Sequence, residues 1–361
     1  MRFLAVLLLI LLLAAGIAAA YLWYAIEKPY GTMPPAGIFV EIPHGTSRRG
    51  VARILKKEGL IRSAAAFEIY ARRQVKRTLV AGEYFVDHPL SSKEVFWKLA
   101  NGEVYQRPFT VREGETIFDI ARELEQANYM PASEFLKAAQ DPSLIQDIAP
   151  GAKTLEGFLF PATYNLARHA TATELTVMMV RKFRGAIEQI PASRWNGEDS
   201  GSALLPTVTL ASLVERETPI PEERPVVAGV YADRLKKGML LQCDPTVIYA
   251  LQQIGEYKGT LTLKDLRYDS PYNTYIHAGL PPGPIGNPGE ASLRAALDPA
   301  PTDYLFFVAN TQGGHFFART LAEHNQNVLK YHRLLNGQPA EPPASEARPV
   351  QAPGPNHKGK Q

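Results

Sequence analysis

The sequence is poor in the residues that metal and cofactor sites need. Cys243 is the only cysteine among 361 residues, which excludes an internal disulfide framework and a cysteine-based zinc cluster. The histidines His277, His315 and His324 do not form the four-residue spacing of a His-Glu-x-x-His zinc site. No glycine-rich phosphate loop opens a helix, and Ser212 does not lie in the strand–turn–helix of a serine nucleophile. We therefore expect no metal, no cofactor and no nucleotide chemistry.

The sequence also lacks a strong charge imbalance. Its 39 basic and 36 acidic side chains leave a net charge of +3, without a basic stripe interleaved with aromatic residues. Such a stripe is the usual footprint of a nucleic-acid-binding protein, so we expect no nucleic-acid partner. The apolar content of 45% is that of an ordinary folded protein, and the length allows two or three domains.

Residues 3–26 form one long uncharged run that ends in Tyr21, Trp23 and Tyr24. About 20 apolar residues cross a bilayer as a helix, and aromatic residues favour its interfaces. A cleaved signal peptide is the alternative, because residues 18–20 are alanines that would suit a peptidase. The run continues past these alanines, which favours a retained anchor. The short basic tip before it predicts a cytoplasmic N-terminus in the inner (cytoplasmic) membrane, with a single span and all later residues outside.

Turn residues and apolar periodicity divide the rest of the chain into an α+β architecture. The predicted parts are a cytoplasmic tip and transmembrane helix over 1–27, a linker over 28–37, a small α+β region over 38–147, a larger mixed α+β domain over 148–335 and a disordered proline-rich tail over 336–361. Within the small region we predict helices over 64–73 and 92–100 and a strand over 82–86.

The small region contains an internal repeat. Residues 42–55 align with residues 111–124 at one constant offset, and each copy is typical of a short strand, a glycine turn and an amphipathic helix. The identical pairs are Gly45 and Gly114, Ala52 and Ala121, Arg53 and Arg122, and Leu55 and Leu124. We predict two related strand–turn–helix units that pack together.

Residues 207–218 predict a helix that ends in two carboxylates, Glu215 and Glu217. Negative charge is unusual at this end, since the helix dipole disfavours it there. The helical rotation places Glu217 beside two leucines and Glu215 beside small residues at 208, 211 and 212. Small neighbours leave room for a ligand. We therefore predict that Glu215 faces a groove, although two solvated helix-end charges are a common alternative.

Four clusters between residues 155 and 285 combine aromatic, amide, acidic or rigid proline residues. Aromatic faces and amide groups are a common way to hold a sugar ring. Any one cluster alone is more often structural. The candidate substrate-binding residues are Glu156, Tyr164, Glu217, Gln242, Asp244, Thr246, Tyr272, Asn273, Tyr275, Leu280, Pro281 and Pro282.

These clusters together resemble the signatures of the YceG/MltG family. The segments that carry the resemblance, in the family's order, are Leu155-Glu-Gly-Phe-Leu-Phe-Pro161, Leu210-Ala-Ser-Leu-Val-Glu-Arg-Glu-Thr218, Leu241-Gln-Cys-Asp-Pro-Thr-Val-Ile-Tyr249, Tyr272-Asn-Thr-Tyr275 and Gly279-Leu-Pro-Pro-Gly-Pro-Ile285. Residues 109–121 also resemble a LysM module, a small fold that binds glycans containing N-acetylglucosamine. Two positions depart from the family: Ala162 replaces an expected acid, and Cys243 replaces an expected Ser or Thr.

The resemblance implies a membrane-anchored endolytic murein transglycosylase with a LysM-like region before its catalytic domain. It implies that Glu215 is the catalytic acid and base. Glu215 would protonate the glycosidic oxygen after N-acetylmuramic acid and then accept the proton of that sugar's 6-hydroxyl, which closes a 1,6-anhydro ring without water. The sugar's N-acetyl oxygen would support the developing positive charge. Glu156 and Asp244 would hold flanking sugars.

The implied partners are the glycan strands of peptidoglycan, the membrane and the murein synthases whose nascent strands the protein would cut. Two alternatives stay open at this point. One is a non-catalytic glycan-binding anchor that tethers the synthases to the wall. The other is a muramidase-type hydrolase, which would use water and leave a reducing end.

Overall fold

The computed structural model describes residues 2–190 and 204–339. Most of the predicted tail over 336–361 therefore lies outside the described residues. The fold is mixed α+β, as predicted, and its contacts divide the chain into two compact units. Unit 1 comprises Met1–Pro108 and Asn165–Ala170, and unit 2 comprises Phe109–Tyr164 and Thr171–Gln361. This division falls at 108/109, earlier than the boundary near residue 147 that the sequence suggested.

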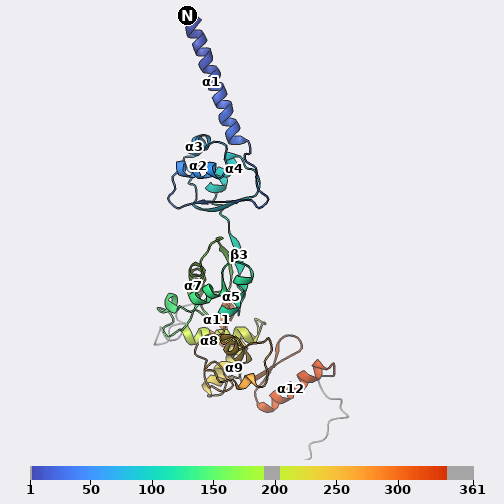
Figure 1. Ribbon diagram of the computed structural model, residues 1–361. Coiled ribbons are helices and arrows are strands. Elements are labelled where there is room, and N and C mark those ends of the chain that lie inside the picture. The colour runs from blue at the N-terminus through green and yellow to red at the C-terminus, as the bar shows by residue number, and fades with distance from the viewer. Residues whose placement is uncertain (1, 191–203, 340–361) are drawn as a thin grey trace, which may run out of the picture. The chain divides into compact units, whose positions relative to one another are not determined.

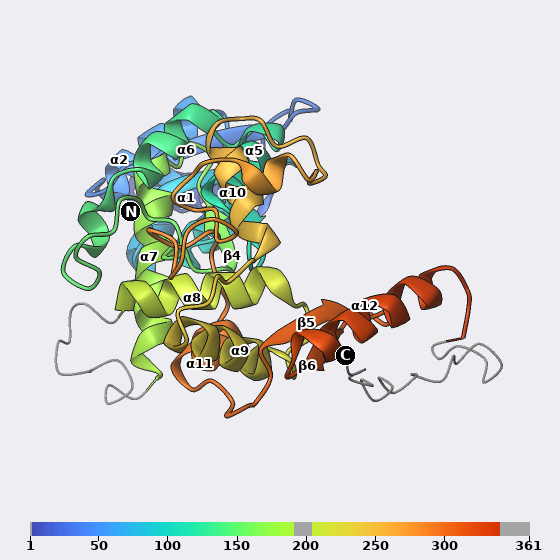
Figure 2. The same cartoon turned by 90° about the horizontal axis from the view of Figure 1, so that it is seen from below.

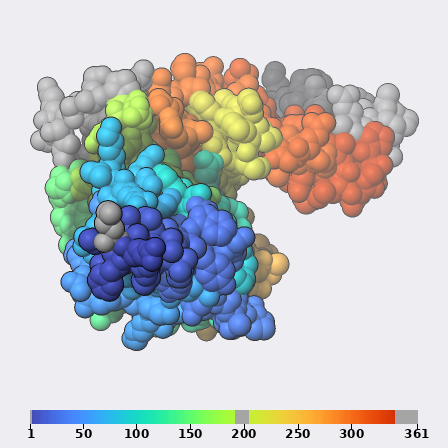
Figure 3. Space-filling model, turned by 90° about the horizontal axis from the view of Figure 1, so that it is seen from above, coloured from blue at the N-terminus to red at the C-terminus, as the bar shows by residue number. Residues whose placement is uncertain are grey.

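Unit 1 begins with α1 (Arg2–Glu27), a helix long and apolar enough to cross a membrane. The end of α1 is docked onto the folded part of unit 1 (Figure 1), and Figure 3 looks down on this unit from the N-terminal side of α1. Ala25 and Ile26 are buried against Ala66, and the Ser92 hydroxyl donates a hydrogen bond of 2.9 Å to the Ala25 carbonyl. Lys93 pairs with Glu27 at 3.1 Å. The helix therefore continues directly into the fold.

The core of unit 1 lies between one hairpin and three helices. Strand β1 (Ile38–Ile42) pairs antiparallel with β2 (Gly82–Val86), and the strands alternate so that Val40 and Tyr84 face inward. The helices are α2 (Arg48–Lys57), α3 (Ala64–Arg73) and α4 (Ser92–Ala100), each begun by a serine that caps its first turn. The predictions for β2, α3 and α4 are confirmed.

The two copies of the repeat share their order of elements but do not share a core. The second copy is β3 (Arg107–Thr110) followed by α5 (Ile117–Gln126), which matches β1 and α2. Gly45 and Gly114 both have a φ near +80° in the intervening turn, a conformation that glycine adopts at little cost. However, β1 pairs with β2, whereas β3 pairs with β4 (Thr163–Leu166). Each copy thus has its own strand partner, and α2 belongs to unit 1 whereas α5 belongs to unit 2.

Unit 2 is built around α8 (Leu204–Glu217), the helix predicted over 207–218. Its neighbours are α9 (Arg224–Lys236), α10 (Asp244–Gln253) and α11 (Glu290–Leu297), as Figure 2 shows. From Val208 to Val214 every residue of α8 is buried. A helix that is apolar on all sides belongs in the middle of a domain, so its polar end is held in place by several segments at once.

The remaining elements of unit 2 surround this centre. They are α6 (Ala132–Ala139), the 3₁₀ helices η1 (Pro142–Ile145) and η3 (Asp265–Arg267), α7 (Ala172–Glu188), the antiparallel pair β5 (Phe306–Ala309) and β6 (His315–Ala318), and α12 (Leu321–Leu335). Helix α12 packs on the β5–β6 hairpin.

Candidate active site

Both carboxylate oxygens of Glu215 are engaged in hydrogen bonds, at the edge of a charged cavity of about 410 Å³. Its Oε1 accepts a hydrogen bond of 2.7 Å from Arg224 Nη2, and its Oε2 accepts one of 2.9 Å from the backbone N–H of Gly289. Gly289 is the N-cap of α11, where the helix dipole favours a negative charge. Burial raises the pKa of Glu215, and the Gly289 N–H and Arg224 oppose that rise. The side chain is only 4% exposed, so Glu215 serves to join α8, α9 and α11.

Glu217, in contrast, borders a cavity of about 480 Å³. Its Oε2 accepts hydrogen bonds from the Tyr231 hydroxyl at 3.0 Å and from Cys243 Sγ at 3.3 Å. Its Oε1 has no hydrogen-bond partner among the described residues. Burial raises the pKa of Glu217, against the opposing effect of the Cys243 and Tyr231 hydrogen bonds. The geometry thus gives Glu217 a free oxygen and a bias toward the protonated form.

The assignment of the groove to the Glu215 side of α8 therefore needs correction. The small residues on that side do not leave space, because other segments fill it. Ser212 Oγ accepts a hydrogen bond of 3.0 Å from the Ile285 backbone N–H. A Cβ on Gly157 would lie 2.5 Å from Pro284 Cβ and 2.9 Å from Val208 Cγ1, so these chains are already in close contact. The small side chains allow tight packing of the backbone, and the cavity lies on the opposite side.

The cavity beside Glu217 combines aromatic, amide and acidic groups. Its lining residues are Glu217, Arg234, Leu241, Gln242, Asp244, Tyr275, Phe306, Phe307, Val308, Ala309, His315, Leu321 and His324. Gln242 has a φ of +52°, an uncommon conformation for a residue other than glycine. Strained backbone of this kind tends to occur at functional sites. The lining is of the type that holds sugars.

Four of the predicted substrate-binding residues line this cavity: Glu217, Gln242, Asp244 and Tyr275. The Tyr275 hydroxyl donates a hydrogen bond to Asp244 Oδ1, which fixes one against the other. Tyr272 is half-buried against Tyr249, with ring centroids 5.0 Å apart.

The other predicted contacts do not line the cavity. Thr246 and Asn273 are buried in hydrogen bonds that hold the loops after α9 and η3, and Tyr164 is buried with its hydroxyl bonded to the Phe160 carbonyl. In the loop before α11, Leu280 is partly exposed, Pro281 is buried and Pro282 is exposed.

Glu156 is a structural residue in this fold. It is 1% exposed, and it accepts hydrogen bonds of 3.0 Å from the Ile117 backbone N–H and 2.9 Å from Asn287 Nδ2. Asn287 in turn accepts the backbone N–H groups of Gly157 and Leu159. Burial raises the pKa of Glu156 to about 8. The pair joins three distant segments of unit 2, and no surface of Glu156 remains for a sugar.

Among residues that were not predicted as site residues, Arg234 and His315 line the cavity, and Tyr231 and Glu223 hold cavity residues in place. Tyr231 orients Glu217, and Arg234, one helical turn further along α9, donates hydrogen bonds to the carbonyls of Leu241 and Leu305 in the cavity wall. Glu223 bonds both the ring and the backbone of His315. Tyr231 and Arg234 lie three residues apart on α9, so their shared helix face could be found from the sequence. His315 and Glu223 are far apart in the sequence, so their contact could not be found in that way.

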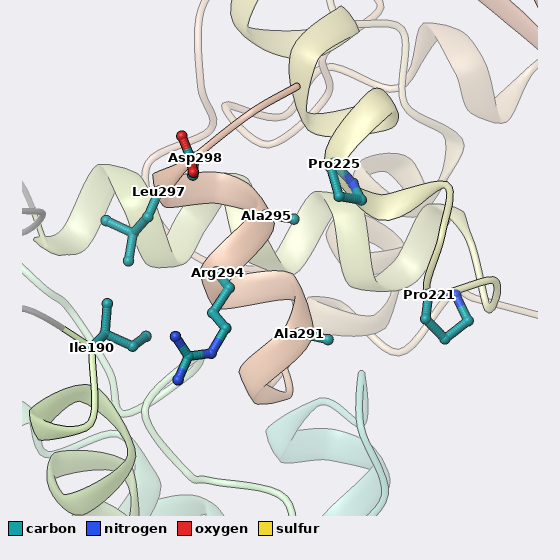
Figure 4. A pocket seen from close by; sticks show the side chains of 8 residues that line it. All are labelled: Ile190, Pro221, Pro225, Ala291, Arg294, Ala295, Leu297 and Asp298. Atoms are coloured by element: carbon teal, nitrogen blue, oxygen red, sulfur yellow. The ribbon is translucent and has the colours of Figure 1, made fainter. Parts of the chain in front are cut away.

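Two other cavities in unit 2 are less suited to acid chemistry on sugars. One, of about 560 Å³, lies beside α11 and is lined mostly by proline, alanine, leucine and isoleucine, with Arg294 reaching toward Ile190 (Figure 4). The other, of about 410 Å³, borders Glu215 and contains mainly charged side chains that pair with one another, such as Arg112 with Glu115 and Glu123. Neither cavity has an aromatic side chain in its lining.

Comparisons with known proteins agree on one relationship. Residues 40–330 match the model of the YceG-like family. A Bacillus subtilis protein named endolytic murein transglycosylase is 35% identical over 308 residues, which cover 81% of this chain and 84% of that protein. A Streptococcus pneumoniae protein of the same name is 29% identical, and the match spans 58% of its length. A crystal structure of a YceG-like protein from Listeria monocytogenes is similar with a TM-score of 0.54 and 34% identity, covering 81% of this chain and 99% of that one.

Proposed function

The chain belongs to the YceG-like family, and from that premise we propose that Glu217 is the acid with which it cuts murein. The family match and the relatives named endolytic murein transglycosylase give the chain a lytic transglycosylase function in the cell wall. The observation that carries the proposal is the position of Glu217. Burial raises the pKa of both carboxylates of α8, but Glu217 borders the cavity lined with aromatic residues, whereas Glu215 borders the charged cavity of about 410 Å³.

The proposed reaction needs one proton donor and no water. Protonated Glu217 gives its proton to the glycosidic oxygen that follows N-acetylmuramic acid, and the bond from C1 to that oxygen breaks. The 6-hydroxyl of the same sugar forms the new bond to C1, and its proton passes to the carboxylate. The product carries a 1,6-anhydro ring, and Glu217 is again protonated. Tyr231 and Cys243 support this role because they hold Oε2 and leave Oε1 for the substrate.

The products distinguish this reaction from hydrolysis. Asp244 lines the same cavity as Glu217, and a hydrolase could use it as the second carboxylate that activates water. We expect purified murein treated with the protein in ¹⁸O-labelled water to release strands with unlabelled 1,6-anhydro ends. Mass spectrometry reads this directly. Reducing ends that carry the label would replace the proposal with a muramidase, and no cleavage at all would support a non-catalytic anchor.

We also propose that α1 is a retained single-pass anchor of the inner (cytoplasmic) membrane, with its N-terminus in the cytoplasm and the residues that follow α1 outside. The apolar length of α1 and its docking onto unit 1 support this, since a removed segment would have no need of such contacts. The protein purified from its native membrane should keep Met1 or Arg2 at its N-terminus. A mature N-terminus near Tyr21 would show that the segment is a cleaved signal peptide.

Glycan binding by the LysM-like residues 109–121 and an association with murein synthases are further proposals that rest on the family resemblance. Murein pull-down and synthase co-purification measure these two associations separately from cleavage.

A further inference from the structure

We propose that His315, held by Glu223, is a second proton-transfer group of the cavity and contacts the reacting sugar. This inference rests on the proposed function of Glu217, and it assigns a separate residue to one of the two proton transfers. His315 begins β6, next to the turn that connects β5 to β6.

Two hydrogen-bond contacts to the Glu223 carboxylate hold His315 in one orientation. Its Nδ1 lies 2.7 Å from Glu223 Oε2, and its backbone N–H donates to Glu223 Oε1 at 2.9 Å. The Thr218 hydroxyl donates to Glu223 Oε2 at 3.0 Å. Thr218 directly follows Glu217 in the sequence. Glu223, which holds His315, is therefore hydrogen-bonded to the end of α8 that carries Glu217.

The charge state of Glu223 determines which ring nitrogen is available. Burial would raise the pKa of Glu223, but the hydrogen bonds from His315 and Thr218 lower it below the ordinary value. An ionised carboxylate only accepts hydrogen bonds, so His315 Nδ1 must carry the proton that they share. The neutral ring then keeps its lone pair on Nε2. This atom has no hydrogen-bond partner among the described residues.

His315 and Glu217 line the same cavity and interact electrostatically. A positive charge on His315 lowers the pKa of Glu217, opposite to the effect of burial. The other titratable groups that line the cavity are Arg234, Asp244, Tyr275 and His324, and Glu223 lies behind His315. Phe307 packs edge-on against the His315 ring with 5.1 Å between the centroids, which limits its rotation.

With two groups, the acid and the base of the reaction can be different residues. Glu217 protonates the glycosidic oxygen as the bond from C1 to that oxygen breaks. His315 Nε2 takes the proton of the 6-hydroxyl as O6 bonds to C1. The cycle ends with an imidazolium and a carboxylate, which return to their starting states by losing and gaining one proton through solvent. No other reactant is required.

The proposal predicts a bell-shaped dependence of kcat on pH, with an acidic limb from His315 and a basic limb from Glu217. We expect His315→Gln to lower kcat about 10²-fold, the lower end for a positioned proton-transfer group, and to remove the acidic limb while the basic limb stays. Glu223→Gln should also lower kcat, because an amide can donate to Nδ1 as well as accept from it and so no longer fixes the ring proton on that nitrogen.

The control is His277→Gln, since His277 is half-exposed, pairs with Asp269 and does not line the cavity. It should keep the wild-type pH profile. Thermal unfolding of each variant separates loss of fold from loss of chemistry, and the position of the limb is independent of the folded fraction. An acidic limb that persists unchanged in His315→Gln would overturn the inference. The release of anhydro ends by that variant at a wild-type rate would overturn it too, and would leave the function of Glu217 standing.

Discussion

Replacement of Glu217 with Gln should lower the rate of murein cleavage by at least about 10²–10⁴-fold, the usual contribution of a positioned proton donor. Gln has nearly the shape of the protonated acid, and its carbonyl oxygen can still accept the hydrogen bonds of Tyr231 and Cys243. It cannot transfer a proton. Release of anhydro-ended strands from purified murein, followed by mass spectrometry, measures the effect.

The stability of the Glu217→Gln variant should stay close to that of the wild type, because burial already favours the neutral form of this side chain. Thermal unfolding provides the check. A variant that unfolds normally but still cleaves at a near wild-type rate would show that Glu217 is not the acid. If Glu217→Gln does not fold, Glu217→Asp takes its place in the test. The shorter Asp keeps a carboxylic acid but withdraws it from the cavity, so its rate of murein cleavage should fall as well.

Replacement of Glu215 with Gln should have the opposite outcome and cost stability instead of chemistry. Arg224 is 6% exposed, and Glu215 is its close partner at 2.7 Å. Removal of one charge from a buried pair typically destabilises a protein by about 3–5 kcal/mol, because the other charge stays buried without compensation. Glu113, at 3.4 Å, is half-exposed and can replace Glu215 only in part.

Denaturant unfolding at constant pH measures this loss, and the rate per folded molecule should stay within a few-fold of the wild type. The double variant Glu215→Gln with Arg224→Met supplies the control. It removes both charges, so part of the stability should return. The family resemblance and the rotation of the helix predicted instead that Glu215 carries the chemistry. If Glu215→Gln folds like the wild type and loses cleavage, that first assignment was right and the one from the structure is wrong.

The sequence predicted α8 and its two carboxylates, but the helical rotation pointed to Glu215, whereas the cavity lined with aromatic residues borders Glu217. Helical rotation tells which residues share a face, and it does not tell what packs on that face. The face with Val208 and Ser212 is covered by Gly157, Pro284 and Ile285, which lie far away in the chain. The small residues there are explained by close backbone packing. The same signal in the sequence would accompany a groove, so only the fold separates the two.

Local patterns also gave the secondary structure of unit 1, since each helix has its own capping serine and each strand its own alternation. They gave part of the cavity, because Gln242 and Asp244 are close in sequence to one another. Local sequence patterns could not predict that Glu156 is buried in a hydrogen-bond network or that His315 lines the cavity. Both depend on partners, Asn287 and Glu223, that lie about 90 to 130 residues away.

The docking of α1 onto unit 1 has a mechanical consequence. Because Ala25 accepts a hydrogen bond from Ser92 and Glu27 pairs with Lys93, the last turn of α1 cannot rotate freely against α3 and α4. A flexible tether would let unit 1 explore all heights and orientations above a bilayer. If α1 is the membrane anchor proposed above, a helix joined in this way would transmit any tilt that it adopts in the lipid to the folded part of unit 1. Because tilting is one way in which a helix accommodates hydrophobic mismatch, bilayer thickness would then influence the orientation of the folded part of unit 1.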